Sequence, residues 1–594
     1  MTAVVQQREN QRNGSTMTID ESISQLQHVA EGLVTDLREV LDGNVVAAQL
    51  DPVGFGGVLR GAVASLAGQP MEVAQAAANY SARGTQAAVA AGLRALGVSV
   101  DGPVELAEER RYADPAYTSN AWFYLARQQH ALFTEYVHEL VRRAHVTGHE
   151  RQKLEYAANQ VIEATAPANF PLTNPAVFKQ AFDTGGLSVL RGLRNMVRDQ
   201  ITNRGQPRQV TPGEFRVGRD LAVTPGKVVY RNRLIELIQY EPQTERVHAV
   251  PMLFSPPWIN KYYIMDLAPE KSLVEWAVQH GHTCFMISYR NPDASLRDVT
   301  MSDYLREGPL AAMDAIEEIT GAPEVNIVAL CLGGTLAAAT AAWLAARGEK
   351  RIGSLTLLNT LLDFQGVGQL GVFTDEATID RIEARIQRDG YLPAETMKST
   401  FDLLRATDLV WNYVVNDWML GKDPKPFDML TWNSDSTRMP AAMHIEYLRK
   451  CYLRNELANG EMQLADERLD LGQVQQDAYL VTAEADHIAP WAAVLRGAGR
   501  LGGSVRFVLS NSGHIAGVVN PPSPKSKHWV SESATLDADP DTWRDGAAQQ
   551  DTSWWEDWTG WIAAHAGDQR RNPPPLGSTA HPALADAPGD YVRG

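Results

Sequence analysis

Short apolar runs alternate with helix-like segments from about residue 215 onward, and this alternation limits the folds open to the chain. The strand-like runs include TCFMISY, VNIVAL, IGSLTLLNT, DAYLVTAEAD and SVRFVLSNSGH, and helix-like segments such as TLAAATAAWLAARG lie between them. Strand–helix–strand order predicts a mostly parallel sheet that is covered by helices on both faces. We therefore expect an α/β domain over residues 201–594.

The other parts of the chain differ from this pattern. Residues 1–17 are polar and are expected to be disordered. Apolar residues recur at helical spacing over residues 18–200, which predicts a helical N-terminal domain. The excursion between TLLNT and DAYLVT, at about 362–474, is too long for a crossover loop. We expect it to form a cap (lid) domain over the carboxyl ends of the strands, and we expect 570–594 to be an extended, Pro-rich tail.

Composition excludes several classes of protein. The 594 residues carry a net charge of −17, whereas a general nucleic-acid binder needs a basic face for phosphates. Three cysteines and no paired Cys/His pattern predict neither a disulfide framework nor a metal site. The N-terminus lacks a basic and apolar leader, and no apolar run reaches the length of a membrane span. These features predict a cytoplasmic protein.

The segment IVALCLGG at 327–334 ends an apolar run on a cysteine and two glycines. This order is typical of a nucleophile elbow, the sharp strand-to-helix turn of the α/β-hydrolase fold. Cys331 takes the nucleophile position, Gly333 takes the last small position, and Ala329 stands where the pattern has glycine. The following helix would direct its positive end toward the thiol. Taken alone, the motif also fits a buried core cysteine.

In this fold the catalytic acid and the histidine follow in chain order, after later strands. Asp486 comes after DAYLVTAEA, and His514 comes after SVRFVLS. Such an aspartate can cap a helix and a lone histidine can be structural, but three placements in the right order predict a catalytic triad. His514 would take the Cys331 proton, and Asp486 would orient the imidazole and support its charge. His487 is the rival base, and its place beside the acid favours a supporting hydrogen bond instead.

An oxyanion hole needs two N–H donors, of which one should be the backbone of Leu332, the residue after the nucleophile. The other should come from the loop SPPWIN. Pro256 and Pro257 have no N–H, so the backbone of Ser255 or of Trp258 is the second candidate.

Several longer segments make the chain similar to a known family. They include NFPLTNPAVF, FRVGRDLAVTPGKVVY, PPWINKYYIMDL, VNIVALCLGGT, ADHIAPW, NSGHIAGVVNPP and SWWEDWTGWI, spread over residues 165–594. With these segments the chain resembles the polyhydroxyalkanoate synthases, most of all class I, the single-gene short-chain type. The G-x-C-x-G-G box of the family is matched except at Ala329. Cys331, Asp486 and His514 fall on the family's triad positions.

The resemblance implies an acyltransferase that polymerises (R)-3-hydroxyacyl-CoA, mainly 3-hydroxybutyryl-CoA, into polyester and releases coenzyme A. No cofactor is implied, since the substrate itself carries coenzyme A. Cys331 would hold the growing chain as a thioester, and His514 or Asp486 would deprotonate the 3-hydroxyl. Trp432 would lie in the cap, whose movement opens the site. The resemblance also implies a homodimer on cytoplasmic polyester granules, with granule-coating proteins (phasins) as partners.

Two other functions fit parts of the pattern. A Cys-His-Asp thioesterase or dienelactone-type hydrolase shares the fold and the triad, but it needs neither the long cap nor the large N-terminal domain. A non-catalytic granule-associated protein would not need an ordered triad. The product formed from (R)-3-hydroxybutyryl-CoA separates these functions.

Overall fold

The computed structural model describes residues 55–532, 536, 539–567 and 571–594. These residues form two compact units, one of 55–211 with 405–425 and the other of 212–404 with 426–594. The segment 1–17, expected to be disordered, and the first part of the predicted helical domain lie outside the described residues.

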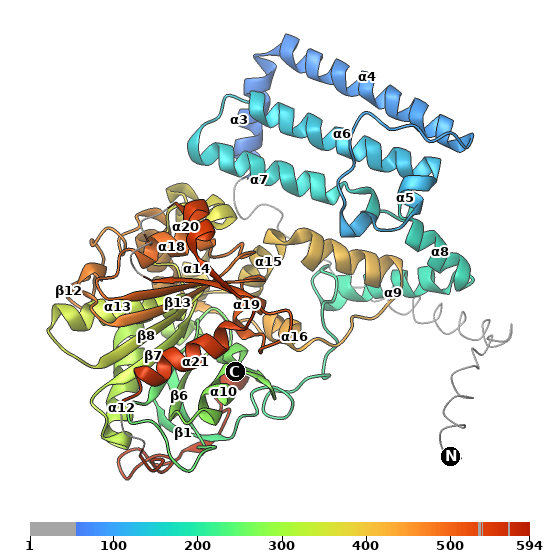
Figure 1. The fold of residues 1–594 in the computed structure, drawn as a ribbon. Helices are drawn as coiled ribbons and strands as arrows, with labels where there is room; N and C mark the ends of the chain where they lie inside the picture. The colour runs from blue at the N-terminus through green and yellow to red at the C-terminus, as the bar shows by residue number, and fades with distance from the viewer. Residues whose placement is uncertain (1–54, 533–535, 537–538, 568–570) are drawn as a thin grey trace, which may run out of the picture. The chain divides into compact units, whose positions relative to one another are not determined.

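The larger unit is built on an eleven-stranded sheet (Figure 1), with the strand order β16-β15-β14-β13-β8-β7-β3-β6-β2-β1-β17. The strands are β1 Gly226–Arg231, β2 Ile235–Tyr240, β3 Met252–Ser255, β6 Cys284–Tyr289, β7 Val325–Leu330, β8 Ile352–Leu358, β13 Asp477–Ala483, β14 Val505–Ser510, β15 His528–Glu532, β16 Ala548–Gln550 and β17 Ala585–Asp586. The strands from β6 to β14 in this order are parallel, and those outside them are antiparallel. The predicted mostly parallel sheet is thereby confirmed.

Helices cover both faces of this sheet, because alternate residues of each strand point to opposite sides. In β7, Ile327 and Ala329 belong to one apolar cluster, and Val328 and Leu330 belong to the other. The first cluster is completed by α12 (Ala311–Thr320), α13 (Leu332–Ala346) and α18 (Trp491–Ala498), and the second by α10 (Leu273–Gln279), α19 (Ala516–Val519) and α21 (Trp554–Ala564). Together with the parallel strands, this three-layer arrangement forms an α/β-hydrolase fold.

The long insertion between β8 and β13 is mainly helical. Its principal helical elements in the larger unit are α14 Glu376–Asp389, α15 Ala394–Leu404, α16 Asp428–Ser434, α17 Ala441–Tyr447 and the π-helical turn η10 Leu448–Leu453. It also holds two short two-stranded sheets, β9 (Tyr391–Leu392) with β10 (Met439–Pro440) and β11 (Gln463–Leu464) with β12 (Glu467–Arg468). Residues 405–425, which lie inside the predicted cap 362–474, group with the N-terminal unit instead. They hold the π-helical turns η8 (Thr407–Trp411) and η9 (Val414–Met419).

The N-terminal unit consists of helices, as the sequence pattern predicts. They are α3 Phe55–Ala67, α4 Pro70–Ala95, α5 Ala116–Ser119, α6 Ala121–Arg143, α7 Gly148–Ala164, α8 Pro175–Asp183 and α9 Leu187–Thr202. The side chain of Asn120 caps α6 by accepting the backbone N–H of Trp122 at 3.0 Å. Helix α9 packs on η9 at Gly192, where a Cβ would lie 1.9 Å from the Trp418 carbonyl oxygen. Within the described residues, none of the helices combines the length and apolar character needed to cross a membrane.

The Pro-rich C-terminal segment packs along the edge of the sheet. Strand β17 pairs with β1, and the Tyr591 hydroxyl donates to the carbonyl oxygen of Asn232 at 2.6 Å. The Glu236 carboxylate accepts the backbone N–H groups of Asp590 and Tyr591, each at 2.9 Å. These contacts hold the C-terminal residues against β1, β2 and the turn between them.

Candidate active site

Cys331 lies at the turn between β7 and α13. Its backbone has φ 52° and ψ −119°, a conformation that costs energy for a residue with a side chain. The Cys331 N–H donates to the Leu358 carbonyl at 2.8 Å, and the Cys331 carbonyl accepts the N–H of Gly334 at 2.9 Å. The strained turn is thus held from both sides, and it leaves the thiol partly exposed.

The two glycines after Cys331 allow the first turn of α13 to pack directly on neighbouring backbone. A Cβ on Gly333 would lie 2.1 Å from the Ser255 carbonyl oxygen, and a Cβ on Gly334 would lie 1.9 Å from Thr360 Oγ1. Neither position therefore has room for a side chain. Ala329, which replaces the glycine of the family box, is completely buried in β7 between Ser255 and Leu357.

Asp486 and His514 meet at the carboxyl ends of β13 and β14. His514 Nδ1 lies 2.6 Å from Asp486 Oδ2, and both side chains are buried. The other oxygen of Asp486 accepts the backbone N–H groups of Ile488 and Ala489, each at 2.8 Å. Asp486 therefore both shapes its own loop and orients the imidazole.

The pKa of His514 is affected by Cys331 as well as by Asp486, which indicates that the three predicted triad residues lie together. Burial by itself lowers the pKa of His514, but the Asp486 charge, the hydrogen bond to Asp486 and the interaction with Cys331 outweigh it. The pKa is raised to about 10 from the ordinary value of 6.5. At neutral pH the imidazole is consequently protonated, and it can donate to the sulfur.

Asn359 is a site residue that the sequence analysis missed. It follows β8, and its side-chain amide donates a hydrogen bond to the backbone carbonyl of His514. Its own N–H donates to the Val481 carbonyl of β13 at 2.7 Å. Asn359 thus fixes the position of the loop that carries His514 relative to the sheet. One sequence feature could have identified Asn359. It is the first polar residue after β8, the buried strand that pairs with the nucleophile strand β7.

The two other candidate side chains, His487 and Trp432, lie in different places. His487 is half-buried beside Asp486, but the imidazole bonded to Asp486 is that of His514. Trp432 of α16 is buried, and its indole N–H donates to the Lys261 carbonyl at 2.8 Å. The Lys261 ammonium is buried as well, and it donates to the Val592 carbonyl at 2.7 Å. Trp432 and the C-terminal segment therefore hold the loop after β3 in place.

The oxyanion-hole candidates lie on both sides of Cys331. Leu332 is the first residue of α13, so its N–H has no acceptor within the helix. Ser255 is the last residue of β3 and pairs in register with Ala329 of β7. Trp258 lies beyond the two prolines, in the loop, and its carbonyl accepts the Thr437 hydroxyl at 2.8 Å. The loop position of Trp258 leaves its backbone outside the strand ladder that contains Ser255.

The remaining cysteines are unsuited to act as nucleophiles. Cys284 and Cys451 are completely buried, and burial raises the pKa of both thiols. Among the three cysteines, Cys331 alone is partly exposed.

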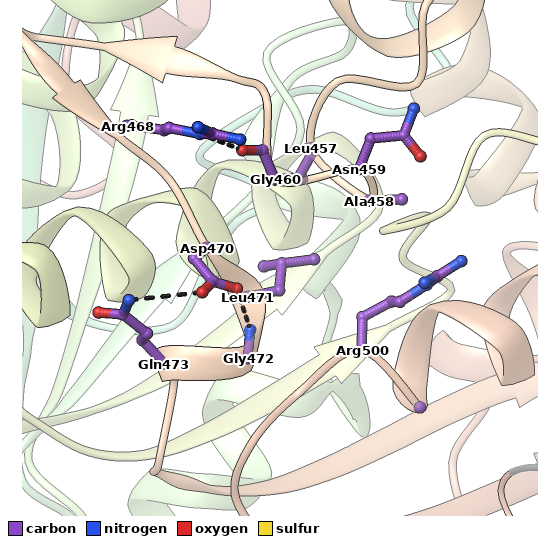
Figure 2. Close-up of a pocket in the computed structure, with 11 residues that line it drawn as sticks. Leu457, Ala458, Asn459, Gly460, Arg468, Asp470, Leu471, Gly472, Gln473 and Arg500 are labelled. Atoms are coloured by element: carbon purple, nitrogen blue, oxygen red, sulfur yellow. Dashed lines mark hydrogen bonds between the residues drawn. The ribbon is translucent and has the colours of Figure 1, made fainter.

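A separate hollow of about 640 Å³ lies among the 457–460 turn, residues 468–473 and Arg500 (Figure 2). Its polar groups mostly bind one another: Arg468 donates to the Gly460 carbonyl, and Asp470 accepts from Gly472 and Gln473. None of the predicted triad residues lines this hollow, so we do not place the reaction there.

Comparison with known proteins gives two family matches. Residues 108–277 match a family described as "Poly-beta-hydroxybutyrate polymerase (PhaC) N-terminus", and residues 242–521 match the alpha/beta hydrolase fold. The second match agrees with the sheet and helix layers described above.

Curated relatives match most of the chain. A poly(3-hydroxyalkanoate) polymerase subunit PhaC from Rhizobium meliloti is 42% identical over 504 residues, which cover 84% of this chain and 82% of the relative. A poly(3-hydroxyalkanoate) polymerase from Methylorubrum extorquens is 43% identical, covering 82% of this chain and 80% of the relative. The polymerase subunit PhaC of Cupriavidus necator is 40% identical, with coverages of 82% and 83%.

The packing at Gly333 gives a first prediction. Gly333→Ala would place a methyl group against the Ser255 carbonyl, so we expect it to lower the free energy of unfolding by about 2–3 kcal/mol. Gly560→Ala, in α21 with open space around its Cβ, is the matched control and should be neutral or slightly stabilising. Thermal melting of both variants measures the difference. Equal melting temperatures would contradict the close packing.

The raised pKa of His514 predicts how its contribution to stability depends on pH. A group whose pKa is higher in the folded protein stabilises it fully below the unfolded pKa, and loses this effect as the pH rises through the folded pKa. The gap in melting temperature between the wild type and His514→Gln should therefore be widest near pH 6 and narrow toward pH 10. A gap that stays constant or widens over this range would show that the imidazole is not held protonated.

Proposed function

The chain belongs to the poly(3-hydroxyalkanoate) polymerases, which are acyltransferases, and we propose that it polymerises (R)-3-hydroxyacyl-CoA into polyester with release of coenzyme A through Cys331, His514 and Asp486. The observation that carries the choice of residues is the hydrogen bond between Asp486 and His514, together with the place of Cys331 at the strained turn before α13 and its effect on the pKa of His514. It lies at the carboxyl ends of the strands, the usual ligand-binding edge of such sheets.

The first half-reaction loads the cysteine. The Cys331 sulfur attacks the thioester carbonyl carbon, the bond from this carbon to the sulfur of coenzyme A breaks, and the departing thiolate takes the proton held by His514. The oxygen that becomes negative in between is bound by the Leu332 N–H and by a second backbone N–H, for which the loop position favours Trp258 over Ser255. The products are free coenzyme A and a hydroxyacyl thioester on Cys331.

The second half-reaction forms the ester bond. His514, now neutral, takes the proton of a 3-hydroxyl group from another hydroxyacyl-CoA, and the hydroxyl oxygen attacks the thioester on Cys331. The carbon–oxygen bond forms as the carbon–sulfur bond to Cys331 breaks, which restores the thiolate and leaves the proton on His514. The lengthened acyl-CoA can then load Cys331 again. Each cycle therefore adds one monomer and releases one coenzyme A.

The contacts of Asp486 favour His514 as the base for the 3-hydroxyl. Both oxygens of Asp486 are occupied, one by His514 and the other by two backbone N–H groups. Direct attack of Asp486 on the hydroxyl proton would break one of these sets of bonds. We therefore assign to Asp486 the orientation and charge support of His514.

The choice of monomer, the location and the partners of the protein are inferred from the family and from the product. The likeness to the class I enzymes favours short-chain monomers, with 3-hydroxybutyryl-CoA as the main substrate. An insoluble polyester bound through its end to Cys331 would keep the enzyme at the surface of a polymer granule in the cytoplasm. A homodimer and phasin partners at that surface complete the proposal.

Cys331→Ala provides the direct test of this function. With (R)-3-hydroxybutyryl-CoA, the wild type should release free thiol and form polymer, whereas Cys331→Ala should reduce release by at least about 10³-fold because the nucleophile is lost. Cys284→Ala is the matched control, since its thiol is buried in β6, and it should keep its activity. Release of free hydroxyacid in place of polymer would indicate a hydrolase. No release by the wild type would indicate a non-catalytic granule protein.

A further inference from the structure

Six aromatic side chains form a connected belt at the carboxyl edge of the sheet. We call them the aromatic belt: Trp258, Tyr289, Tyr304, Phe364, Tyr447 and Tyr452. The Trp258 ring centroid lies 5.5 Å from that of Tyr304 and 6.2 Å from that of Tyr447. The Phe364 centroid lies 5.0 Å from that of Tyr452 and 6.2 Å from that of Tyr447. Edge-to-face packing of this kind holds the rings in defined positions.

The belt is assembled from the sheet and from the insertion. Trp258 follows β3, Tyr289 ends β6 and Phe364 follows β8, while Tyr304 comes from the short helix α11 (Met301–Leu305). Tyr447 ends α17 and Tyr452 lies in η10, so both belong to the insertion. A π-helical turn such as η10 is often found at a functional site.

The loop that carries Trp258 contacts the Cys331 turn, because a Cβ on Gly333 would lie 2.1 Å from the Ser255 carbonyl oxygen and 2.6 Å from the Pro256 carbonyl oxygen. The Cys331 side chain packs against the apolar clusters on both faces of the sheet, of which one contains Trp258, Phe364 and Tyr447. Burial raises the pKa values of Tyr447 and Tyr452. The Tyr447 ring lies 6.2 Å from that of Trp258 and 5.4 Å from that of Tyr452, so ring contacts join both phenols of the insertion to the loop at the Cys331 turn.

Trp258 contributes an unsatisfied polar group to the belt. Its side chain is 3% exposed, and its indole Nε1 has no hydrogen-bond partner among the described residues. A buried donor without a partner costs about 1–3 kcal/mol. Binding sites are mostly apolar with a few polar groups that fix the ligand, and an acceptor on a ligand would satisfy this N–H.

The acyl part of the proposed substrate has the matching chemistry. It carries two oxygens and a small apolar side chain, and its carbonyl oxygen is assigned to backbone N–H groups at the elbow. The 3-hydroxyl oxygen is the acceptor that remains. We propose that the aromatic belt is the acyl subsite, in which the rings limit the length of the side chain and the Trp258 indole N–H binds the 3-hydroxyl oxygen. This inference rests on the proposed function.

The subsite gives the insertion a role in selecting substrates. Since Phe364, Tyr447 and Tyr452 come from the insertion and the other three rings from β6, α11 and the loop after β3, the subsite is complete only when the insertion packs on these elements. A methyl side chain needs little displacement of these rings. A propyl or pentyl side chain would have to separate Tyr452 from Phe364, and the ring contacts would be lost.

Binding measurements test the role of Trp258 apart from catalysis. In a Cys331→Ala background, Trp258→Phe keeps the backbone and an aromatic ring but removes the indole N–H. We expect it to weaken binding of (R)-3-hydroxybutyryl-CoA about 10-fold, and to leave binding of butyryl-CoA, which lacks the hydroxyl, within about twofold. Isothermal titration calorimetry gives the dissociation constant of each ligand with and without the Trp258→Phe change. Equal weakening of both ligands, or of neither, would overturn the hydroxyl contact.

Side-chain length tests the role of the rings. Tyr452 is half-buried, so Tyr452→Ala should fold, and we expect it to raise kcat/KM for 3-hydroxyhexanoyl-CoA relative to 3-hydroxybutyryl-CoA by about 10-fold. Tyr452→Phe keeps the ring and should keep the wild-type ratio. Tyr230→Ala, on β1 with its ring against His581, is the control outside the belt and should also keep it.

The results of these experiments distinguish a failure of the proposed subsite from a failure of the proposed function. An unchanged ratio in Tyr452→Ala, with polymer still formed from 3-hydroxybutyryl-CoA, would overturn the subsite and leave the proposed function standing. If the wild type forms no polymer and the Cys331→Ala protein binds no (R)-3-hydroxybutyryl-CoA, the proposed function itself fails.

Discussion

The strained turn at Cys331 is the constraint on which the rest of the site depends. A left-handed backbone at a non-glycine residue is stable only when its surroundings enforce it. Here the Leu358 carbonyl binds the Cys331 N–H, and the first turn of α13 packs on the Ser255 and Pro256 carbonyls because Gly333 has no side chain. The same packing brings the loop after β3 next to the thiol. This one contact, at Gly333, therefore positions the nucleophile elbow, the loop that offers the second oxyanion donor, and Trp258 of the aromatic belt.

The histidine depends on the neighbouring strands in the same way. Asp486 holds the imidazole from β13, and Asn359 holds its backbone from β8. Because both strands are central and parallel, the distance between the nucleophile and the base is set by the sheet and not by flexible loops. A base held rigidly near a thioester suits a reaction in which the acyl group must wait for a hydroxyl. The apolar rings around it would help to keep water away from that thioester.

The sequence was sufficient for features that follow from local pattern and chain order. Alternating apolar runs predicted the parallel strands, and the positions of Cys331, Asp486 and His514 after three of them predicted that they would meet. Contacts between distant segments were not readable. Nothing near Tyr447 or Tyr452 marks them as ring partners of Trp258 and Phe364, since helical spacing explains them equally well as ordinary core residues. The grouping of 405–425 with the N-terminal helices likewise depends on tertiary packing at Gly192 and Asn195.

In the proposed mechanism Cys331 carries the acyl group, and the mass of the protein during turnover tests this role most directly. The enzyme would be mixed with an equimolar amount of (R)-3-hydroxybutyryl-CoA, quenched in acid within the first turnover and digested for mass spectrometry. If Cys331 carries the acyl group, the peptide with Cys331 gains the mass of hydroxybutyryl groups in step with the release of coenzyme A. Release of coenzyme A with an unmodified Cys331, or with the acyl group on Cys284 or Cys451, would contradict it.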